Sequence, residues 1–287
     1  MQVISKRLTY DSRKDRFFYL VPLGDMHFGH PNCDVDLFLK ARDYIIEKHN
    51  CYWIGMGDYC DAISPSDRRF DMHSIDPNYA TPDKQYRWVE EQLKPIKDKC
   101  LGLLTGNHDI LHWKKHGHDY VDGMAYAMEV PYLMDLGYIR LFFERVSTNG
   151  SSHSTTFNIL AEHGCTAARE TSAKVGRIED MADRIPGLDL YLMGHTHVRG
   201  ASPPRTQLFI NKELRVTSFE ENFCFTGSYL KGYLEGKVSY VEEMEYKPTT
   251  LGSPLIQVEV EPEGHFHERP MVSFSVAVSG DGSGRPQ

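Results

Sequence analysis

Five short apolar segments of this sequence run directly into clusters of aspartate, asparagine and histidine. The clusters are GDMHFGH at 24–30, GDYCD at 57–61, GNHD at 106–109, EHG at 162–164 and GHTH at 194–197. Short apolar runs closed by glycine or another turn residue are typical of buried strands. In open α/β sheets the loops after neighbouring strands converge at the carboxyl edge, where ligands bind. The sequence therefore predicts one polar site assembled from five strand ends.

The spacing of apolar residues predicts how these strands are connected. We expect strands over 17–23, 51–56, 101–105, 157–162 and 188–193, and helices over 34–48, 81–96, 121–128 and 175–185. Beyond residue 200 we expect strands with little helix between them, over 206–210, 214–219, 222–226, 237–241 and 255–260. This order predicts an α/β core that is extended by a second, largely antiparallel sheet.

The length of 287 residues is compatible with one large domain. We expect a single domain over 1–265, with its core motifs in 18–200 and a β-rich completion in 201–265. Residues 266–287 would be a C-terminal extension. The Gly/Ser-rich stretch from about residue 279 is expected to lack fixed structure.

Composition excludes several classes of protein. The charged N-terminus lacks the apolar stretch of a secretory signal, and no run is long enough to span a membrane. The six cysteines form no CxxC pair and are interpreted as reduced thiols of a cytoplasmic protein. A formal net charge of −8 argues against a surface that attracts nucleic acid or anionic lipid as a whole.

The donor atoms in the five clusters favour a metal site. Carboxylate, amide and imidazole groups dominate and no thiolate is prominent, which favours Mn, Fe, Zn or Mg in a hydrolytic site over a structural zinc site. A single Asp-x-His motif, or the GNHD motif alone, also fits an ordinary capped turn. Capped turns do not explain five such clusters that each follow a strand.

At these motifs the sequence closely resembles the calcineurin-like metallophosphoesterases, over about residues 18 to 200. The resemblance implies a four-layer α/β/β/α sandwich, in which helices flank two mixed sheets and a dinuclear metal site lies at the C-terminal strand ends. It implies one metal ion held by Asp25, His27, Asp58 and His197. It implies a second ion held by Asp58, Asn107, His163 and His195, so that Asp58 bridges the pair.

The resemblance also identifies His108 as the catalytic histidine. It could stabilise charge on the phosphate and protonate the leaving group. We expect Asp109 to contribute to catalysis, and Asp109 and Asp61 to accept hydrogen bonds that orient imidazoles, with an ordinary turn cap as the alternative for Asp109.

The substrate class is less constrained. Protein phosphatases of this family carry an arginine where this chain has Ala62, which argues against a phosphoprotein substrate. Arg68, Arg69 and Lys231 are candidate phosphate contacts, with solvated loop positions as the alternative for the two arginines. The stretches HWKKHGH at 112–118 and YLKGY at 229–233 mix cations with aromatic rings, as nucleic-acid contacts do, although surface loops often carry the same mixture.

We therefore expect a phosphodiesterase that depends on two divalent metal ions and acts on nucleic acid or a nucleotide. Manganese is the first choice of metal, with Fe, Zn, Ni and Mg as alternatives. A phosphomonoesterase acting on a small metabolite is the second hypothesis, and a non-catalytic metal-binding scaffold is the third. The expected partner is a phosphoester substrate, either DNA or a nucleotide, and no membrane. The oligomeric state is left open.

Overall fold

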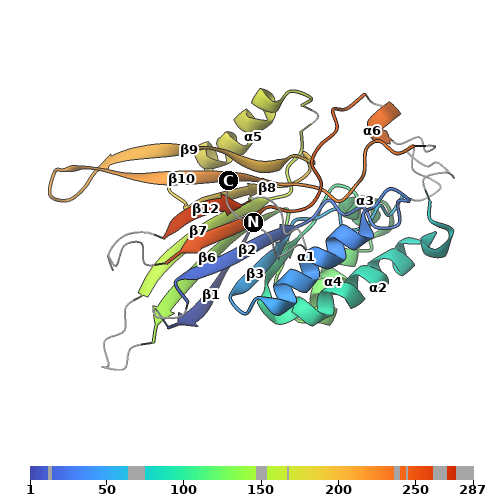
Figure 1. The fold of residues 1–287 in the computed structure, drawn as a ribbon, viewed down its shortest axis with the longest axis horizontal. Helices are drawn as coiled ribbons and strands as arrows, with labels where there is room; N and C mark the ends of the chain where they lie inside the picture. The colour runs from blue at the N-terminus through green and yellow to red at the C-terminus, as the bar shows by residue number, and fades with distance from the viewer. Residues whose placement is uncertain are drawn as a thin grey trace.

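Two six-stranded mixed sheets form the centre of the computed structural model (Figure 1). The structure describes residues 1–11, 15–63, 75–146, 154–166, 168–235, 240–243, 245–260 and 270–275. In spatial order the first sheet contains β1 (Gln2–Tyr10), β6 (Leu136–Arg145), β7 (Ser154–Glu162), β8 (Leu190–Met193), β10 (Val216–Thr226) and β9 (Arg199–Ile210). The second contains β12 (Met271–Ser275), β11 (Leu255–Glu259), β2 (Phe17–Leu23), β3 (Cys51–Gly55), β4 (Cys100–Leu104) and β5 (Tyr132–Met134).

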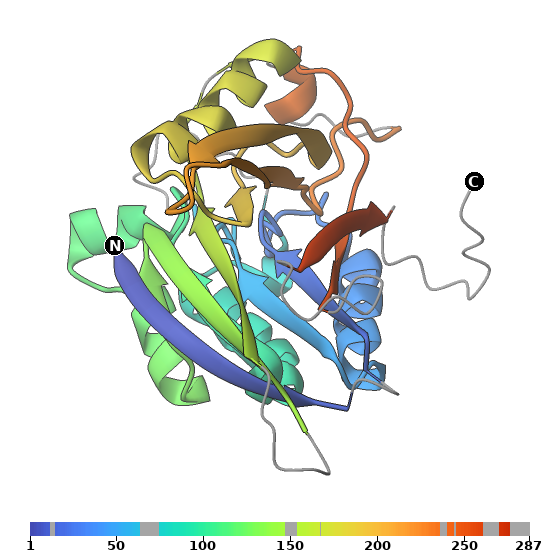
Figure 2. The same ribbon diagram turned by 90° about the vertical axis from the view of Figure 1, so that its left-hand side faces the viewer.

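Helices cover the outer faces of both sheets (Figure 2). The α-helices are α1 (Val35–Glu47), α2 (Pro82–Leu93), α3 (Asp109–His116), α4 (Tyr120–Met128), α5 (Thr171–Arg184) and α6 (Tyr240–Glu243), and the 3₁₀ helices are η2 (Pro77–Tyr79) and η3 (Lys94–Lys99). None of the helices in the described ranges is long and apolar enough to cross a membrane.

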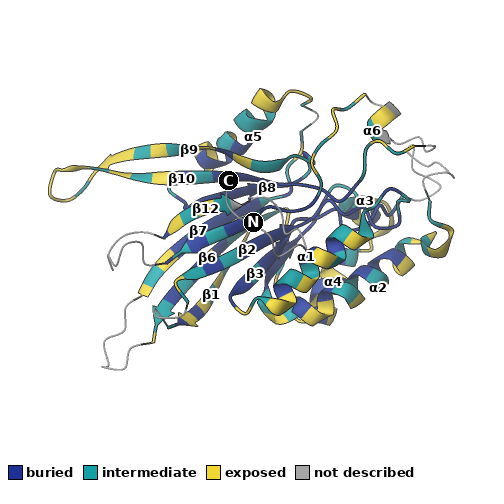
Figure 3. Cartoon of the chain, viewed as in Figure 1, coloured by how far each residue is buried: buried dark blue, intermediate teal, exposed yellow. Residues whose placement is uncertain are grey.

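Three buried clusters define the layers. The cluster between the sheets joins residues such as Phe143 and Phe157 to Ile54 and Ile256. A second cluster packs α1, α2 and α4 against the second sheet, and a third packs α5 against β8 and β10. Burial is concentrated along the strands between the helical layers (Figure 3). The expected four-layer sandwich of two mixed sheets is confirmed.

The later strands do not form a sheet of their own, so that expectation was wrong. β10 pairs in parallel with β8 and antiparallel with β9, which extends the first sheet. β11 instead pairs antiparallel with β2 and extends the second sheet. Each of these strands adds to an edge that is already present, because pairing there satisfies its backbone groups.

Other elements also differ from the sequence expectation. The strands expected over 214–219 and 222–226 are one continuous strand, β10, with an irregular register between Glu221 and Phe223. The end of the strand expected over 237–241 lies in the short helix α6, and residues 237–239 lie outside the described ranges. β12 pairs with β11, within the segment that was expected to be an extension, and the tail from residue 279 lies outside the described residues.

Candidate metal centre

The carboxyl ends of five strands from both sheets meet at one place. β2, β3 and β4 are parallel neighbours in the second sheet, and β7 and β8 are parallel neighbours in the first. Each of these strands leads directly into one of the five polar clusters. The structure therefore brings together all seven residues implied as metal ligands: Asp25, His27, Asp58, Asn107, His163, His195 and His197.

The backbone of these loops adopts an uncommon conformation. Six residues with side chains have φ between 49° and 61°: Asp25, His27, Asp58, Ala62, His195 and His197. This left-handed region costs energy for residues other than glycine, and such strain is concentrated at functional sites. Here it turns the chain sharply after β2, β3 and β8.

Two glycines allow the loops after β3 and β4 to approach closely. Gly57 has φ of +86°, and a Cβ atom on it would lie 2.5 Å from the backbone nitrogen of Gly106. A Cβ atom on Gly106 would lie 2.1 Å from Asp58 Oδ1. Neither position has room for a larger residue.

The first group of donor atoms comprises Asp25, His27 and His197. The Nε2 atoms of His27 and His197 are 3.2 Å apart, and His197 Nε2 is 3.4 Å from Asp25 Oδ1. His27 Nε2 is also 3.9 Å from Asp58 Oδ2. Ligands bound at about 2.1 Å around one metal ion lie about 3.0–3.4 Å from each other, so the closest contacts have the expected spacing.

The second group comprises Asp58, His163 and His195, together with Asn107. His163 Nε2 lies 3.3 Å from Asp58 Oδ2 and 3.1 Å from Asn107 Oδ1, and His195 Nδ1 lies 2.6 Å from the same amide oxygen. Asp58 Oδ2 therefore faces both groups. It lies 3.9 Å from His27 Nε2 and 3.3 Å from His163 Nε2.

The hydrogen bonds around these side chains leave the required atoms pointing inward. His163 Nδ1 donates to the carbonyl oxygen of Met56 at 2.7 Å, so its Nε2 lone pair faces Asp58 and Asn107. Asp25 Oδ1 is buried and has no hydrogen-bond partner among the described residues, nor does His27 Nδ1. A buried carboxylate oxygen without a donor is costly unless a cation binds it. The residues present thus fit bound metal ions.

The electrostatics of the cluster also require positive charge. Burial raises the pKa of Asp58, but the imidazoles of His163, His108 and His27 outweigh burial and hold that pKa well below its usual value. Conversely, burial lowers the pKa of His163, but Asp58 and Asp25 raise it to about 10. Both pKa shifts have the same cause, the close approach of buried carboxylates and imidazoles. Divalent cations bound there would supply the positive charge that the carboxylates attract.

His108 lies beside the two groups. Its backbone N–H donates to Asp58 Oδ1 at 2.8 Å, and its Nδ1 donates to the carbonyl oxygen of Asp61 at 2.7 Å. The Asp61 carboxylate is 3.6 Å from His108 Nδ1 and 3.7 Å from His27 Nδ1. The Asp61 carboxylate therefore lies between two imidazoles, and the prediction that it orients them through hydrogen bonds stays a prediction.

The Asp109 carboxylate accepts hydrogen bonds from backbone N–H groups and a tyrosine, and from no imidazole among the described residues. Its Oδ2 accepts 2.8 Å hydrogen bonds from the N–H groups of Asp58 and Gly106, and its Oδ1 accepts the hydroxyl of Tyr86. Burial, followed by the charge of Asp58, raises the pKa of Asp109 to about 6. Asp109 joins the loops after β3 and β4 to helix α2.

Of the three residues predicted to contact phosphate, the structure describes only one. Arg68 and Arg69 lie outside the described residues. Lys231 forms an ion pair with Asp34 at 3.0 Å, and its backbone N–H donates to Asn32. It therefore lies beside the loop after β2, with its ammonium group already paired.

Some residues that hold the centre together were not predicted. Tyr86 supports Asp109 from α2, and Ser228 Oγ donates to the carbonyl oxygen of Asp25 at 2.8 Å from a position 203 residues later in the chain. No local pattern marks either residue. Their contacts depend on how distant segments pack.

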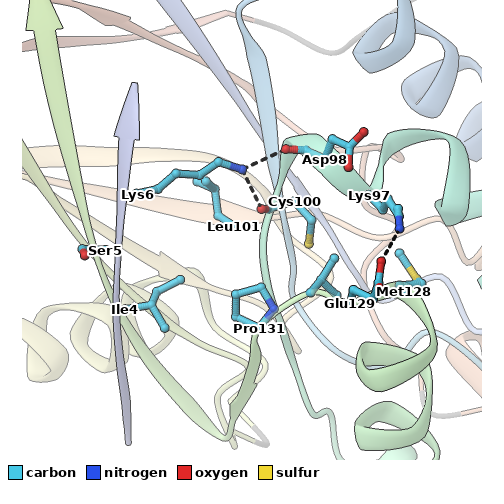
Figure 4. A pocket seen from close by; sticks show the side chains of 11 residues that line it. Ile4, Ser5, Lys6, Lys97, Asp98, Cys100, Leu101, Met128, Glu129 and Pro131 are labelled. Atoms are coloured by element: carbon cyan, nitrogen blue, oxygen red, sulfur yellow. Dashed lines mark hydrogen bonds and ion pairs between the residues drawn. The ribbon is translucent and has the colours of Figure 1, made fainter. Parts of the chain in front are cut away.

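A separate cavity of about 310 Å³ lies between β1, η3, β4 and the segment that joins α4 to β5 (Figure 4). Inside it, Lys6 Nζ donates to the carbonyl oxygens of Asp98 and Cys100, and Lys97 pairs with Glu129. None of the predicted site residues lines this cavity. The candidate site is the strand-end cluster.

No protein-family model and no curated protein matches the sequence. Among solved structures, the chain is similar to a conserved uncharacterized protein, a predicted phosphoesterase, from Streptococcus pneumoniae, at 14% identity and a TM-score of 0.35 over 90% of this chain and 88% of that one. It is also similar to Vps29 from Chaetomium thermophilum, at 12% identity and a TM-score of 0.36 over 90% and 94%. Likeness at this level transfers no residue role to this chain.

The architecture agrees with what the resemblance at the five motifs implies. Two mixed sheets lie between helical layers, and a buried Asp/His cluster that could hold metal lies where strands of both sheets end.

Proposed function

We propose that this protein is a phosphodiesterase that depends on two divalent metal ions and acts on nucleic acid or a nucleotide. The observation that carries the proposal is the position of Asp58 Oδ2, which faces His27 on one side and His163 on the other. Asp25, His27, Asp58 and His197 would hold one ion. Asp58, Asn107, His163 and His195 would hold the other, with manganese as the first metal to test.

Two bound ions would polarise a phosphoryl oxygen and lower the pKa of a water molecule between them. The role of His108 follows from its hydrogen bonds. Since Nδ1 donates to the Asp61 carbonyl oxygen, a proton exchanged with substrate is held at Nε2. The Asp61 carboxylate, 3.6 Å from Nδ1, stabilises the protonated ring. His108 is thereby suited to protonate the departing oxygen.

Ala62 supports a diester substrate over a phosphoprotein. Its side chain is buried, its N–H donates to Gln85 Oε1, and its carbonyl oxygen accepts from His112 Nε2. The position at which related protein phosphatases carry a phosphate-binding arginine is therefore a packed part of the loop.

One assay distinguishes the candidate functions. Protein reconstituted with Mn²⁺ is incubated with bis(p-nitrophenyl) phosphate, p-nitrophenyl phosphate, and single- and double-stranded DNA. We expect cleavage of the diester and of DNA without comparable cleavage of the monoester. Preferential cleavage of the monoester would instead indicate a phosphomonoesterase. No hydrolysis of any substrate by protein that contains metal would refute the enzymatic proposal and favour a scaffold.

A further inference from the structure

A lysine outside the predicted set contacts the loop that carries His195 and His197. Lys174 Nζ donates a 3.2 Å hydrogen bond to the carbonyl oxygen of Thr196, the residue between the two histidines. Thr196 is itself buried, with 7% of its surface exposed. The ammonium group of Lys174 therefore lies at the edge of the candidate metal centre.

The fold directs Lys174 to this place. α5 connects β7 to β8, which are parallel, so its first turn lies at the carboxyl end of both strands. Ile178, Met181 and Ala182 form the buried face of α5. Lys174 is four residues before Ile178 and so lies on the same side of the helix. The side chain of Lys174 is half-buried at this position.

The location is electrostatically unfavourable for a lysine. The first turn of a helix carries partial positive charge, and that of α5 contains no acidic residue. Burial, and then the nearby charge of Lys247, lowers the pKa of Lys174. Lys247 is paired with Glu170 at 3.2 Å, whereas Lys174 forms no ion pair with a carboxylate in the described parts of the chain. Its ammonium group is therefore held by a backbone carbonyl oxygen and not by an acidic side chain.

We propose that Lys174 binds a second phosphate group of the substrate, next to the phosphate that is cleaved. This inference rests on the proposed function. An ammonium group has three N–H donors, and the Thr196 carbonyl oxygen takes one of them. The others can donate to phosphate oxygens, and charge-assisted bonds of this kind are strong. The substrate class is then a phosphodiester with a neighbouring phosphate, either on a strand or on a single nucleotide.

The test compares two esters that differ only in the second phosphate: thymidine 5′-(p-nitrophenyl phosphate) with and without a 3′-phosphate. For Lys174→Ala we expect KM to rise roughly tenfold, equivalent to about 1.4 kcal/mol, for the ester that carries the 3′-phosphate. The kcat for both esters, and KM for the simpler ester, should match wild type. Lys174→Arg should retain most of the affinity, because it keeps the charge.

Two further variants control for loss of structure. Arg177→Ala removes an exposed cation from the same helix, paired with Asp180, and should leave both KM values unchanged. Lys174→Met keeps the aliphatic stem while removing the charge, and it should behave like Lys174→Ala. An equal loss with both esters, or no loss with either, would overturn the inference.

Calorimetry provides a measurement that does not depend on turnover. Mn²⁺-loaded wild-type and Lys174→Met proteins are titrated with thymidine 3′,5′-bisphosphate and with thymidine 5′-monophosphate. The inference requires a weaker bisphosphate affinity in the variant and an unchanged monophosphate affinity. Equal bisphosphate affinities would refute it. If wild type binds both nucleotides but cleaves neither ester, the proposed function fails, and the calorimetric comparison still decides the role of Lys174.

Discussion

Hydrogen bonds from single residues determine which atoms of the candidate centre face the shared space. The Met56 carbonyl oxygen accepts from His163 Nδ1, which aims Nε2 at Asp58. The Asp61 carbonyl oxygen accepts from His108 Nδ1 in the same way. Asp25 Oδ1 has no such partner among the described residues. In the proposed mechanism, His163 and Asp25 would thus present atoms to metal, and His108 would transfer a proton.

Removal of Asp25 should disrupt one ion and not the fold. We expect Asp25→Ala to lower bound metal from two ions per chain to one and to reduce diester hydrolysis by roughly 100-fold or more. Elemental analysis of dialysed protein and the diester assay measure the two effects. Asp36→Ala, which removes an exposed carboxylate of α1, is the matched control and should change neither. Normal turnover by Asp25→Ala would rule out the assigned ligand set.

Removal of His108 should have a different signature. His108→Ala is expected to retain both metal ions and a wild-type circular dichroism spectrum, since no implied ligand is lost. Hydrolysis should fall by roughly 10²–10⁴-fold, the usual range for a general acid. An activated leaving group such as p-nitrophenolate needs less protonation, so the loss should be smaller for bis(p-nitrophenyl) phosphate than for DNA. Equal activity of the variant and wild type on DNA would contradict this role.

Among the elements, β10 has a buried acid far from the metal centre. Glu221 is fully buried and accepts hydrogen bonds from Arg205 Nε at 2.8 Å, Gln207 Nε2 at 3.0 Å and the Gly187 N–H at 2.7 Å. Burial raises the pKa of Glu221, but these hydrogen bonds outweigh burial and hold it below the usual value of 4.5. Glu221 thereby ties β9 and β10 to the loop before β8.

A lowered carboxyl pKa stabilises the fold above the ordinary pKa, and that stabilisation is lost as pH falls through the pKa of the folded state. Glu221→Gln should therefore lower the free energy of unfolding at pH 7 by about 2 kcal/mol, because it removes the charge and presents a donor to other donors. In urea titrations the difference from wild type should stay constant from pH 7 down to about pH 5 and shrink as pH falls below the usual carboxyl pKa of 4.5. Glu220→Gln, at the exposed neighbouring position, should show neither effect. A difference independent of pH would disprove the charge argument.

The elements themselves were predictable to different degrees. Continuous apolar runs such as 17–23 correspond to β2, because a central parallel strand is buried on both faces. β1 and β6 were missed, since their burial alternates along the strand and their outward residues include several charges. Helix α3 was also missed. Its eight residues, beginning at Asp109, overlap the GNHD motif and are too short for a clear periodicity.

In the whole molecule, the candidate centre lies where the two sheets meet. Asp25, Asp58 and Asn107 come from loops of the second sheet, and His163 and His195 from loops of the first. The packing between the sheets therefore positions both halves of the centre. Conversely, a cation that binds both halves should stabilise that packing.

Metal binding should be visible as thermal stability. Mn²⁺ at roughly 100 times its Kd contributes about 2.7 kcal/mol, which raises Tm by about 4–5 °C for a chain of this size. EDTA should reverse the shift in a thermal unfolding experiment followed by circular dichroism. Asp25→Ala should lose much of the shift. The same Tm with and without metal, in both proteins, would count against a site that joins the sheets.

The sequence alone determined the types of donor atom and the loops that carry them, because an apolar run, a sharp turn and a polar cluster form a local pattern. It also indicated the four layers through the resemblance at those motifs. Only the tertiary structure decided which atoms meet: that Asp58 faces both groups, that Asp109 joins two loops to Tyr86, and that Lys174 reaches Thr196. Those contacts join residues 22 or more positions apart, and they depend on how helices and sheets pack, which no local pattern encodes.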